Sequence, residues 1–369
     1  MNDMKFISQG TYGCVFSSNT CKNKKNDTMC ENQKYVSKIQ IQSEIDKESI
    51  FGKSVQTIFQ YNSYFAPILE TYVIDIDTIE RNELTKCKLI QIQKQNKPTN
   101  NPSKYVSSKI RFVGNISIKK HIIKITTMIK KRNILFEMHL HILKGLKKLI
   151  TLNNPIIHND LKDTNILIDD AYNVPIIIDF GLSFTKDDFK KALINPETLK
   201  KIFFSRNYYL PWTIEFTILS YIANDILSNE NKQHINIHID KVEKYLPSLS
   251  FVIQTFVKSN LILIEMDEIK ITFINKMNSY VESFRFKTLM EFIQDLFQSW
   301  ESWDNYSVAI MFYEFIVKNF QKNDIQKDKY LKKYQQFLLN IITSPLLLRS
   351  SPSHTFQFIT SLVNNQTLH

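Results

Sequence analysis

Three polar residues that suit phosphate and metal chemistry lie close together near the middle of the chain. Asp160 can accept a proton, and Asn165 and Asp179 follow it as potential metal ligands. Short apolar runs, 156–157 and 176–178, flank these residues. Because short apolar runs bounded by polar residues are typical of buried strands, the pattern predicts strands that hold a polar site between them.

A glycine-containing segment near the N-terminus could supply phosphate contacts. Gly10 and Gly13 are two of only 6 glycines, and they separate apolar segments, which predicts a hairpin with a glycine turn. A glycine turn lets backbone N–H groups approach phosphate oxygens because no Cβ is in the way. Most glycine hairpins are only turns, so this segment needs partners elsewhere in the chain.

A lysine and a glutamate are candidates for such partners. Lys38 lies inside the strand-like run 34–41, and the helix expected from Ser43 carries Glu48 on the same face as its apolar residues. A carboxylate on a buried face requires a cationic partner. We therefore expect Lys38 and Glu48 to form an ion pair, with Glu44 as the second candidate for the acidic partner.

Length and composition are those of a globular protein. The chain has 369 residues, enough for two lobes, with 43% hydrophobic and 22% charged residues. No apolar run approaches the roughly 20 residues that span a bilayer. The net charge of +11 is compatible with nucleic acid, an acidic membrane surface or acidic substrates. Since the lysines are scattered and no basic run contains interleaved aromatic residues, nucleic-acid binding is possible but not indicated.

The cysteines favour a reducing compartment. The N-terminus does not resemble a signal peptide, so we expect a cytoplasmic protein with free thiols. Cys21 and Cys30 have eight residues between them, which is not a common zinc spacing. Cys14 and Cys87 are the other two cysteines.

Together these features resemble the eukaryotic-type protein kinase catalytic domain, from Met4 to about Val363. The motifs occur in the order of that family. They are a glycine-rich loop at 7–15 with Ser8 in place of the first glycine, a third-strand lysine motif at 36–38, a catalytic loop at 158–165, a metal-binding motif at 179–181, an aspartate-led helix start at 304–307, and the ion-pairing residues Glu215 and Arg349.

The resemblance implies an α+β, bilobal fold. It predicts a small β-rich N-lobe at 1–115, with an insertion at about 78–104. It also predicts a large, mostly helical C-lobe at 116–369, with an insertion at about 216–300 that could bind a partner or simply enlarge the fold.

The activity that the resemblance implies is that of a serine/threonine protein kinase using ATP and Mg²⁺ on protein hydroxyls. In this interpretation Asp160 is the base, Lys162 neutralises charge on the transferred phosphate, and Asn165 and Asp179 bind Mg²⁺. Lys38, held by Glu48, binds the phosphates. The implied nucleotide-binding residues are Ile7, Ser8, Gln9, Gly10, Thr11, Tyr12, Gly13, Cys14, Val15, Val36, Lys38, Glu48 and Leu167.

Several features depart from the family pattern. Asn159 replaces the arginine that usually binds a phosphorylated activation loop, so we expect activity without that phosphorylation. Ile214 replaces the proline that usually precedes the glutamate at 215. The Lys/Asn/Ile-rich composition and the segments 64–67 and 303–307 resemble kinases encoded by large nucleocytoplasmic DNA viruses, which would place the protein in the host cytoplasm or the virion.

Two alternatives remain open. The first is a pseudokinase scaffold that binds partners through 216–300; pseudokinases usually lose the lysine, the base or the metal-binding aspartate, and none is lost here. The second is a small-molecule kinase of the aminoglycoside or choline type, which shares the His-x-Asp pattern of His158 and Asp160 and a later aspartate. Lys162 and the 179–181 motif are more similar to protein kinases.

Overall fold

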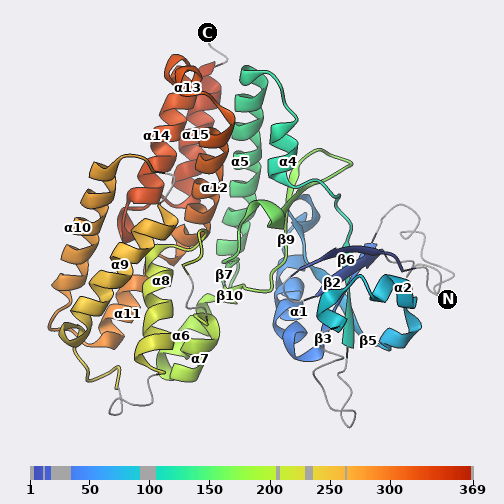
Figure 1. The fold of residues 1–369 in the computed structure, drawn as a ribbon, viewed down its shortest axis with the longest axis horizontal. Helices are drawn as coiled ribbons and strands as arrows, with labels where there is room; N and C mark the ends of the chain where they lie inside the picture. The colour runs from blue at the N-terminus through green and yellow to red at the C-terminus, as the bar shows by residue number, and fades with distance from the viewer. Residues whose placement is uncertain are drawn as a thin grey trace. The chain divides into compact units, whose positions relative to one another are not determined.

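The computed structural model describes residues 4–10, 13–17, 35–91, 105–204, 208–228, 236–261 and 264–366. The chain divides into two compact units (Figure 1). Unit 1 consists of Met1–Ile116 and Ile166–Ser183, and unit 2 of Ser117–Asn165 and Phe184–His369. Strands concentrate in the N-terminal region and helices in the C-terminal region, which confirms the α+β prediction at that level.

The main element of unit 1 is an antiparallel five-stranded sheet. Its strands, in spatial order, are β1 (Phe6–Gln9), β2 (Cys14–Ser17), β3 (Tyr35–Ile41), β6 (Tyr105–Arg111) and β5 (Ile68–Ile74). In the central strand β3, Lys38 lies opposite Val15 on one side and Ser108 on the other. Residues 36–40 of β3 are all buried, and since successive side chains point to opposite faces, Lys38 lies in a buried environment whichever face it is on.

Helix α1 (Gln42–Gln56) packs against β5 and β3. Its described half buries Glu48, Phe51 and Val55 on one face, as the helical spacing predicted. A Cβ on Gly52 would collide with the backbone oxygen of Ile68, so the glycine allows α1 to lie this close to β5. This close packing places Glu48 near the sheet.

A second sheet of unit 1 joins distant parts of the sequence. It contains β4 (Phe65–Ala66), β9 (Pro175–Ile178) and β8 (Ile166–Ile168), with β9 in the centre. The pairing of β4 with β9 is parallel and that of β8 with β9 is antiparallel. The pairing of β4 with β9 brings 166–183 into the same unit as the N-terminal strands.

The described part of the predicted 78–104 insertion, 78–91, contributes to the core of unit 1. It follows the 3₁₀ turn η3 (Ile76–Thr78) and includes α2 (Arg81–Leu84). Ile79, Leu84, Cys87 and Ile90 are buried in one cluster with residues of β2 and β3. Residues 92–104 lie outside the described residues.

Cys87 forms a disulfide with Cys14 of β2, with 6.0 Å between the Cα atoms. The expectation of free thiols was therefore wrong for this pair, because the fold brings together two cysteines 73 positions apart. Cys21 and Cys30 lie outside the described residues.

Unit 2 is mainly helical. A short pair of antiparallel strands, β7 (Ile156–Ile157) and β10 (Phe184–Thr185), stands beside the helices. Helix α12 is buried along most of its length and packs against α5 and α14 (Figure 1). The helices are α4 (Ile118–Ile123), α5 (Met128–Ile150), α6 (Lys186–Ile194), α7 (Pro196–Ile202), α8 (Ile214–Tyr221), α9 (Leu246–Asn260), α10 (Asp267–Ser283), α11 (Leu289–Phe297), α12 (Trp303–Asn319), α13 (Lys322–Lys327), α14 (Lys329–Thr343) and α15 (Pro352–Gln366).

The predicted 216–300 insertion forms a substantial part of unit 2. Helix α9 packs against α8 and α10, and α11 packs against α8. Large apolar side chains such as Phe256, Phe273 and Phe292 are buried there. The described parts of the segment are therefore integrated into the core of unit 2, and a partner-binding role for it stays a prediction.

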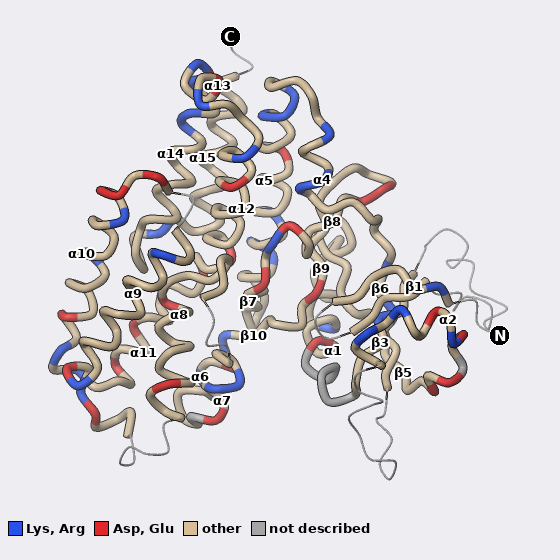
Figure 2. The backbone as a smooth tube through the Cα atoms, in the orientation of Figure 1, with Lys and Arg blue, Asp and Glu red and all other residues tan. Residues whose placement is uncertain are grey.

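Acidic and basic residues are scattered along the helices of unit 2 (Figure 2). Several form ion pairs one helical turn apart, including Asp187 with Lys190 at 2.8 Å and Glu197 with Lys200 at 3.0 Å. Such local pairs add a small stabilisation to their helices. Within the described residues, no helix is both long and apolar enough to cross a membrane.

Candidate functional site

The predicted site residues fall into two groups, one in each unit. We call Lys38, Glu48 and Asp179 the Lys38 group, which belongs to unit 1. We call Asp160, Lys162 and Asn165 the Asp160 group, which belongs to unit 2. Each group is described by itself.

In the Lys38 group, one buried ammonium contacts two carboxylates. The Lys38 Nζ donates to both carboxylate oxygens of Glu48, at 3.1 and 3.0 Å. It also donates to Oδ1 of Asp179 at 3.0 Å. Lys38 and Glu48 are buried, whereas the Asp179 side chain is 35% exposed. The group therefore combines a fixed cation with a carboxylate that a ligand can still reach.

The neighbouring carboxylates keep this lysine charged. Burial alone would lower the pKa of Lys38, but the Glu48 and Asp179 carboxylates outweigh burial and raise it well above its ordinary value. Burial raises the pKa of the Glu48 carboxyl, and the Lys38 ammonium opposes that effect. A lysine with a raised pKa keeps its positive charge over the whole physiological pH range.

Asp179 follows β9 and has a backbone φ of 64°. This left-handed conformation is uncommon for residues other than glycine, although Asn and Asp adopt it more readily than most. The next residue, Phe180, is buried against Phe65, with 6.0 Å between the ring centroids. The buried ring anchors the segment, and the turn at Asp179 directs its carboxylate to Lys38.

Within the described residues 6–10 and 13–17, the glycine hairpin forms as predicted. β1 pairs with β2, and the Gly10 N–H donates to the Gly13 carbonyl at 2.8 Å. A Cβ on Gly13 would lie 2.7 Å from the Ile39 carbonyl oxygen, so the close approach of the hairpin to β3 requires glycine. Ile7, Ser8 and Gln9 lie on β1, and Cys14 and Val15 on β2. Thr11 and Tyr12 lie outside the described residues.

The apolar residues Val15, Val36 and Leu167 of the predicted nucleotide-binding set also belong to unit 1. Val36 pairs with Ile110 across β3 and β6. Leu167 on β8 and Ile110 both pack against a cluster formed by Ala66, Val113 and Ile176. Val15 lies on β2, one strand from Val36.

In the Asp160 group, the backbone just before Asp160 is held by a buried aspartate at the start of α12. The Asp304 carboxylate accepts hydrogen bonds from the N–H groups of His158 and Asn159, at 2.7 and 2.8 Å. The Asn159 carbonyl accepts from Nε1 of Trp212 at 2.8 Å. The sequence pattern had marked Asp304 as a helix start, but the partners of its carboxylate were not predicted.

Asp160 is surrounded by donors. Lys162 Nζ donates to both of its carboxylate oxygens, at 3.2 and 3.1 Å. The Asn165 amide nitrogen donates to Oδ2 at 2.7 Å, and the Tyr209 hydroxyl donates to Oδ1 at 2.7 Å. Sequence reasoning did not identify Tyr209. Tyr209 lies in the aromatic-rich run 208–212. Because such runs are also typical of core packing, the sequence did not mark this tyrosine as a site residue.

The predicted pairing of Glu215 with Arg349 is confirmed within unit 2. Arg349 donates to both carboxylate oxygens of Glu215, at 2.8 and 3.0 Å, and both side chains are almost completely buried. Glu215 also accepts from the Leu346 N–H. Ile214, at the position where the family has proline, is buried beside Glu215 and does not prevent this contact.

Comparisons with known proteins support kinase-like character only locally. No protein-family model matches the chain. Over 48 residues, the chain is 56% identical to a protein from Dictyostelium discoideum named "Probable serine/threonine-protein kinase samkA". The match covers 13% of this chain and 7% of that protein. The prediction of a viral origin has no support in this similarity and stays a prediction.

Proposed function

We propose that this protein is a serine/threonine protein kinase that transfers the γ-phosphate of ATP to protein hydroxyls. The observation that carries the proposal is the buried Lys38 ammonium, held by Glu48 and Asp179 at 3.0 to 3.1 Å. Phosphoryl transfer depends mainly on charge neutralisation and positioning. A permanently charged, immobilised lysine beside an accessible carboxylate suits both requirements.

The oxygen ligands suit Mg²⁺, which prefers carboxylate and other oxygen donors. The Asp179 carboxylate is partly exposed. The two donor contacts of Asn165 use its amide nitrogen, and its amide oxygen accepts no hydrogen bond from the described residues. Asp179 is therefore the residue that would hold one Mg²⁺ ion and Asn165 the residue that would hold a second, and each ion, when bound, would neutralise charge on the phosphate oxygens.

Asp160 and Lys162 would act on the acceptor. In this proposal Asp160 orients the acceptor hydroxyl and takes its proton as that oxygen bonds to the γ-phosphorus, while the bond to ADP breaks. Lys162, whose ammonium contacts Asp160, would stabilise the charge that develops on the transferred group. The proposal includes the bilobal kinase fold that the sequence motifs imply.

The test measures transfer and nucleotide binding separately. Purified protein is incubated with Mg²⁺ and γ-labelled ATP plus casein or myelin basic protein, and labelled residues are identified after hydrolysis. We expect label on serine or threonine, a loss of at least 100-fold in transfer with Asp160→Asn, and weaker Mg·ATP binding with Lys38→Met.

A matched control separates the effect of Lys38 from a general loss of lysine. Lys109 lies on β6 of the same sheet and contacts the Tyr35 ring and Glu70. Lys109→Met should keep both binding and transfer. Transfer that is undiminished in Asp160→Asn would overturn the proposal, and an absence of Mg·ATP binding by calorimetry would favour the pseudokinase scaffold.

A further inference from the structure

The Tyr209 hydroxyl occupies a hydrogen-bonding position on Asp160 that an acceptor hydroxyl would need. Both residues belong to unit 2. The Tyr209 hydroxyl donates to Asp160 Oδ1 at 2.7 Å, and the Tyr209 ring lies 5.4 Å from the Lys162 ammonium, in a cation–π contact. A hydroxyl that donates to the base is the arrangement expected of a phosphate acceptor before transfer.

The Asp160 carboxylate has little remaining capacity to accept hydrogen bonds. An ionised carboxylate offers about four acceptor positions. In this structure it accepts from Lys162 twice, from Asn165 and from Tyr209. Asp160 is also only 4% exposed. Of these three donors, Lys162 and Asn165 already have roles in the proposed reaction, so Tyr209 is the one that an acceptor would displace.

The backbone of Tyr209 is held by hydrogen bonds, so we expect its displacement to occur by rotation of the side chain away from Asp160 and from the Trp212 ring, whose centroid lies 5.1 Å from that of Tyr209. Its carbonyl accepts from the Asn260 amide at 2.8 Å and from the Trp212 N–H at 2.9 Å. Asn260 is buried at the end of α9. These contacts hold the main chain, while the ring is attached through a rotatable Cα–Cβ bond.

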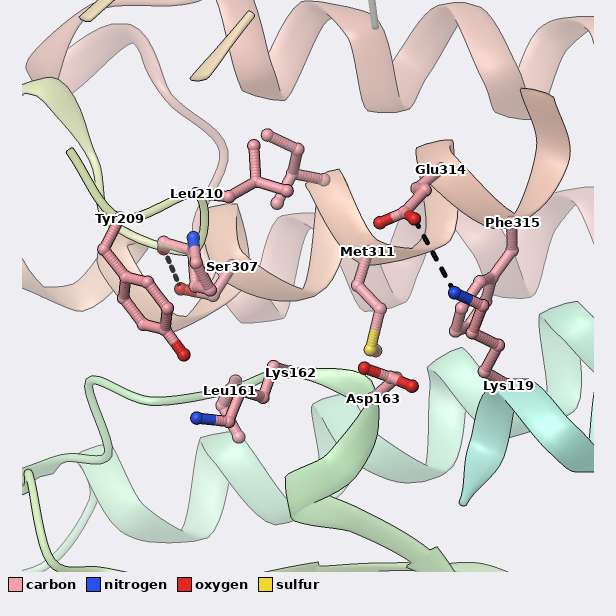
Figure 3. A pocket seen from close by; sticks show the side chains of 12 residues that line it. Lys119, Leu161, Lys162, Asp163, Tyr209, Leu210, Ser307, Met311, Glu314 and Phe315 are labelled. Carbon is pink, nitrogen blue, oxygen red and sulfur yellow. Dashed lines mark hydrogen bonds and ion pairs between the residues drawn. The ribbon is translucent and has the colours of Figure 1, made fainter. Parts of the chain in front are cut away.

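A pocket beside the ring can receive it. The pocket has a volume of about 190 Å³, which exceeds the ~150 Å³ of a protein cavity known to hold benzene. Figure 3 shows Tyr209 at one end of this pocket, with its hydroxyl directed toward Leu161 and Lys162, and Lys119, Glu314 and Phe315 at the other end. Met311 and Leu210 contribute apolar lining between them.

We propose that Tyr209 is a specificity-determining residue that competes with the acceptor hydroxyl for Asp160 and turns away when an acceptor binds. This inference rests on the proposed kinase function. Only acceptors whose other contacts offset the lost Tyr209 hydrogen bond would be phosphorylated efficiently. The hydroxyl thereby raises the KM for acceptors without taking part in the transfer itself.

The test removes only the hydroxyl. Tyr209→Phe keeps the ring over Lys162, and casein is titrated as the acceptor at saturating Mg·ATP. Since hydrogen bonds to charged groups are among the stronger ones, we expect a KM for casein about tenfold lower, with kcat little changed. Tyr208→Phe is the matched control, because the Tyr208 hydroxyl contacts Thr255 and its loss should leave both constants unchanged.

Two results would overturn the inference. A lower kcat in Tyr209→Phe would mean that the hydroxyl positions Asp160 for catalysis. Phosphate found on Tyr209 by mass spectrometry, and absent from Asp160→Asn, would mean that Tyr209 is itself an acceptor.

A measurement without turnover separates this inference from the proposed function. Urea unfolding of Asp160→Ala, Tyr209→Phe and the double variant gives the coupling between the two side chains. Non-additive changes in stability are expected even if the wild type transfers no phosphate. Fully additive changes would show that the contact is absent in solution and would overturn the inference, whatever the activity.

Discussion

At the scale of single residues, Asn159 illustrates how main-chain contacts hold a loop in place. Its backbone φ is 64°, its N–H donates to Asp304 and its carbonyl accepts from Trp212. Asparagine adopts this left-handed conformation more readily than most residues. The main chain of Asn159 therefore helps to hold the loop before Asp160, whatever its side chain does. The expected independence from activation-loop phosphorylation stays a prediction.

The left-handed conformation can be tested by comparing two small substitutions. Asn159→Gly and Asn159→Ala both remove the side-chain amide, but only alanine adds a Cβ that is strained at positive φ. We expect Asn159→Ala to be less stable than Asn159→Gly by about 1 kcal/mol in urea unfolding. Equal stabilities would indicate that the loop relaxes to an ordinary conformation.

At the scale of elements, the packing of α5, α12 and α14 depends on a buried histidine. His139 on α5 is completely buried, and its Nδ1 lies 2.7 Å from the Tyr334 hydroxyl on α14. Its ring stacks on Phe312 of α12 at 4.5 Å. Burial lowers the pKa of His139 to about 3. The three helices therefore pack around a neutral imidazole.

This neutral histidine predicts a loss of stability in acid. In the unfolded chain a histidine has a pKa near 6.5, so below that pH the unfolded state binds a proton that the folded state does not. The stability contributed by neutral His139 is full above pH 6.5 and falls as the pH drops toward about 3. Between pH 6 and 4, we expect wild type to lose about 1 kcal/mol per pH unit more than His139→Gln in urea unfolding.

His238 provides the control for this comparison because it is exposed in the same unit. His238→Gln should retain the wild-type pH dependence. If His139→Gln also retained it, the imidazole would have to become protonated in the folded state.

At the scale of the whole molecule, the disulfide links two parts of the chain 73 positions apart. Its effect on stability arises largely in the unfolded chain, which it restricts to fewer conformations. The same bond ties 76–91 to β2, and the buried residues around it show that this segment is part of the core of unit 1. The +11 net charge already counts the acidic residues, and nucleic-acid binding stays a prediction.

Removing the disulfide should destabilise the protein measurably. We expect the oxidised wild type to be about 2–4 kcal/mol more stable than Cys14→Ala/Cys87→Ala, as measured by urea unfolding without reductant. Adding a reductant should remove most of this difference and leave the double variant unchanged. A wild type that is insensitive to the reductant would indicate that the two thiols are not joined in solution.

The sequence by itself determined the local arrangement of several candidate residues. Periodicity placed Lys38 on a strand and Glu48 on the buried face of a helix, because burial of an apolar face imposes a period of about 2 or 3.6. Glycine spacing indicated the hairpin. The structure adds the reason for Gly13, because a Cβ there would meet β3. The α+β class, by contrast, was implied by the resemblance to protein kinases.

Only the tertiary structure decided which distant residues meet. Asp179 reaches Lys38, 141 positions away, because β9 pairs with β4. Tyr209 reaches Asp160, and Cys87 reaches Cys14, without any short-range pattern that marks them as partners. Such contacts depend on how whole elements bury their apolar surfaces against one another, and local periodicity carries no information about that choice.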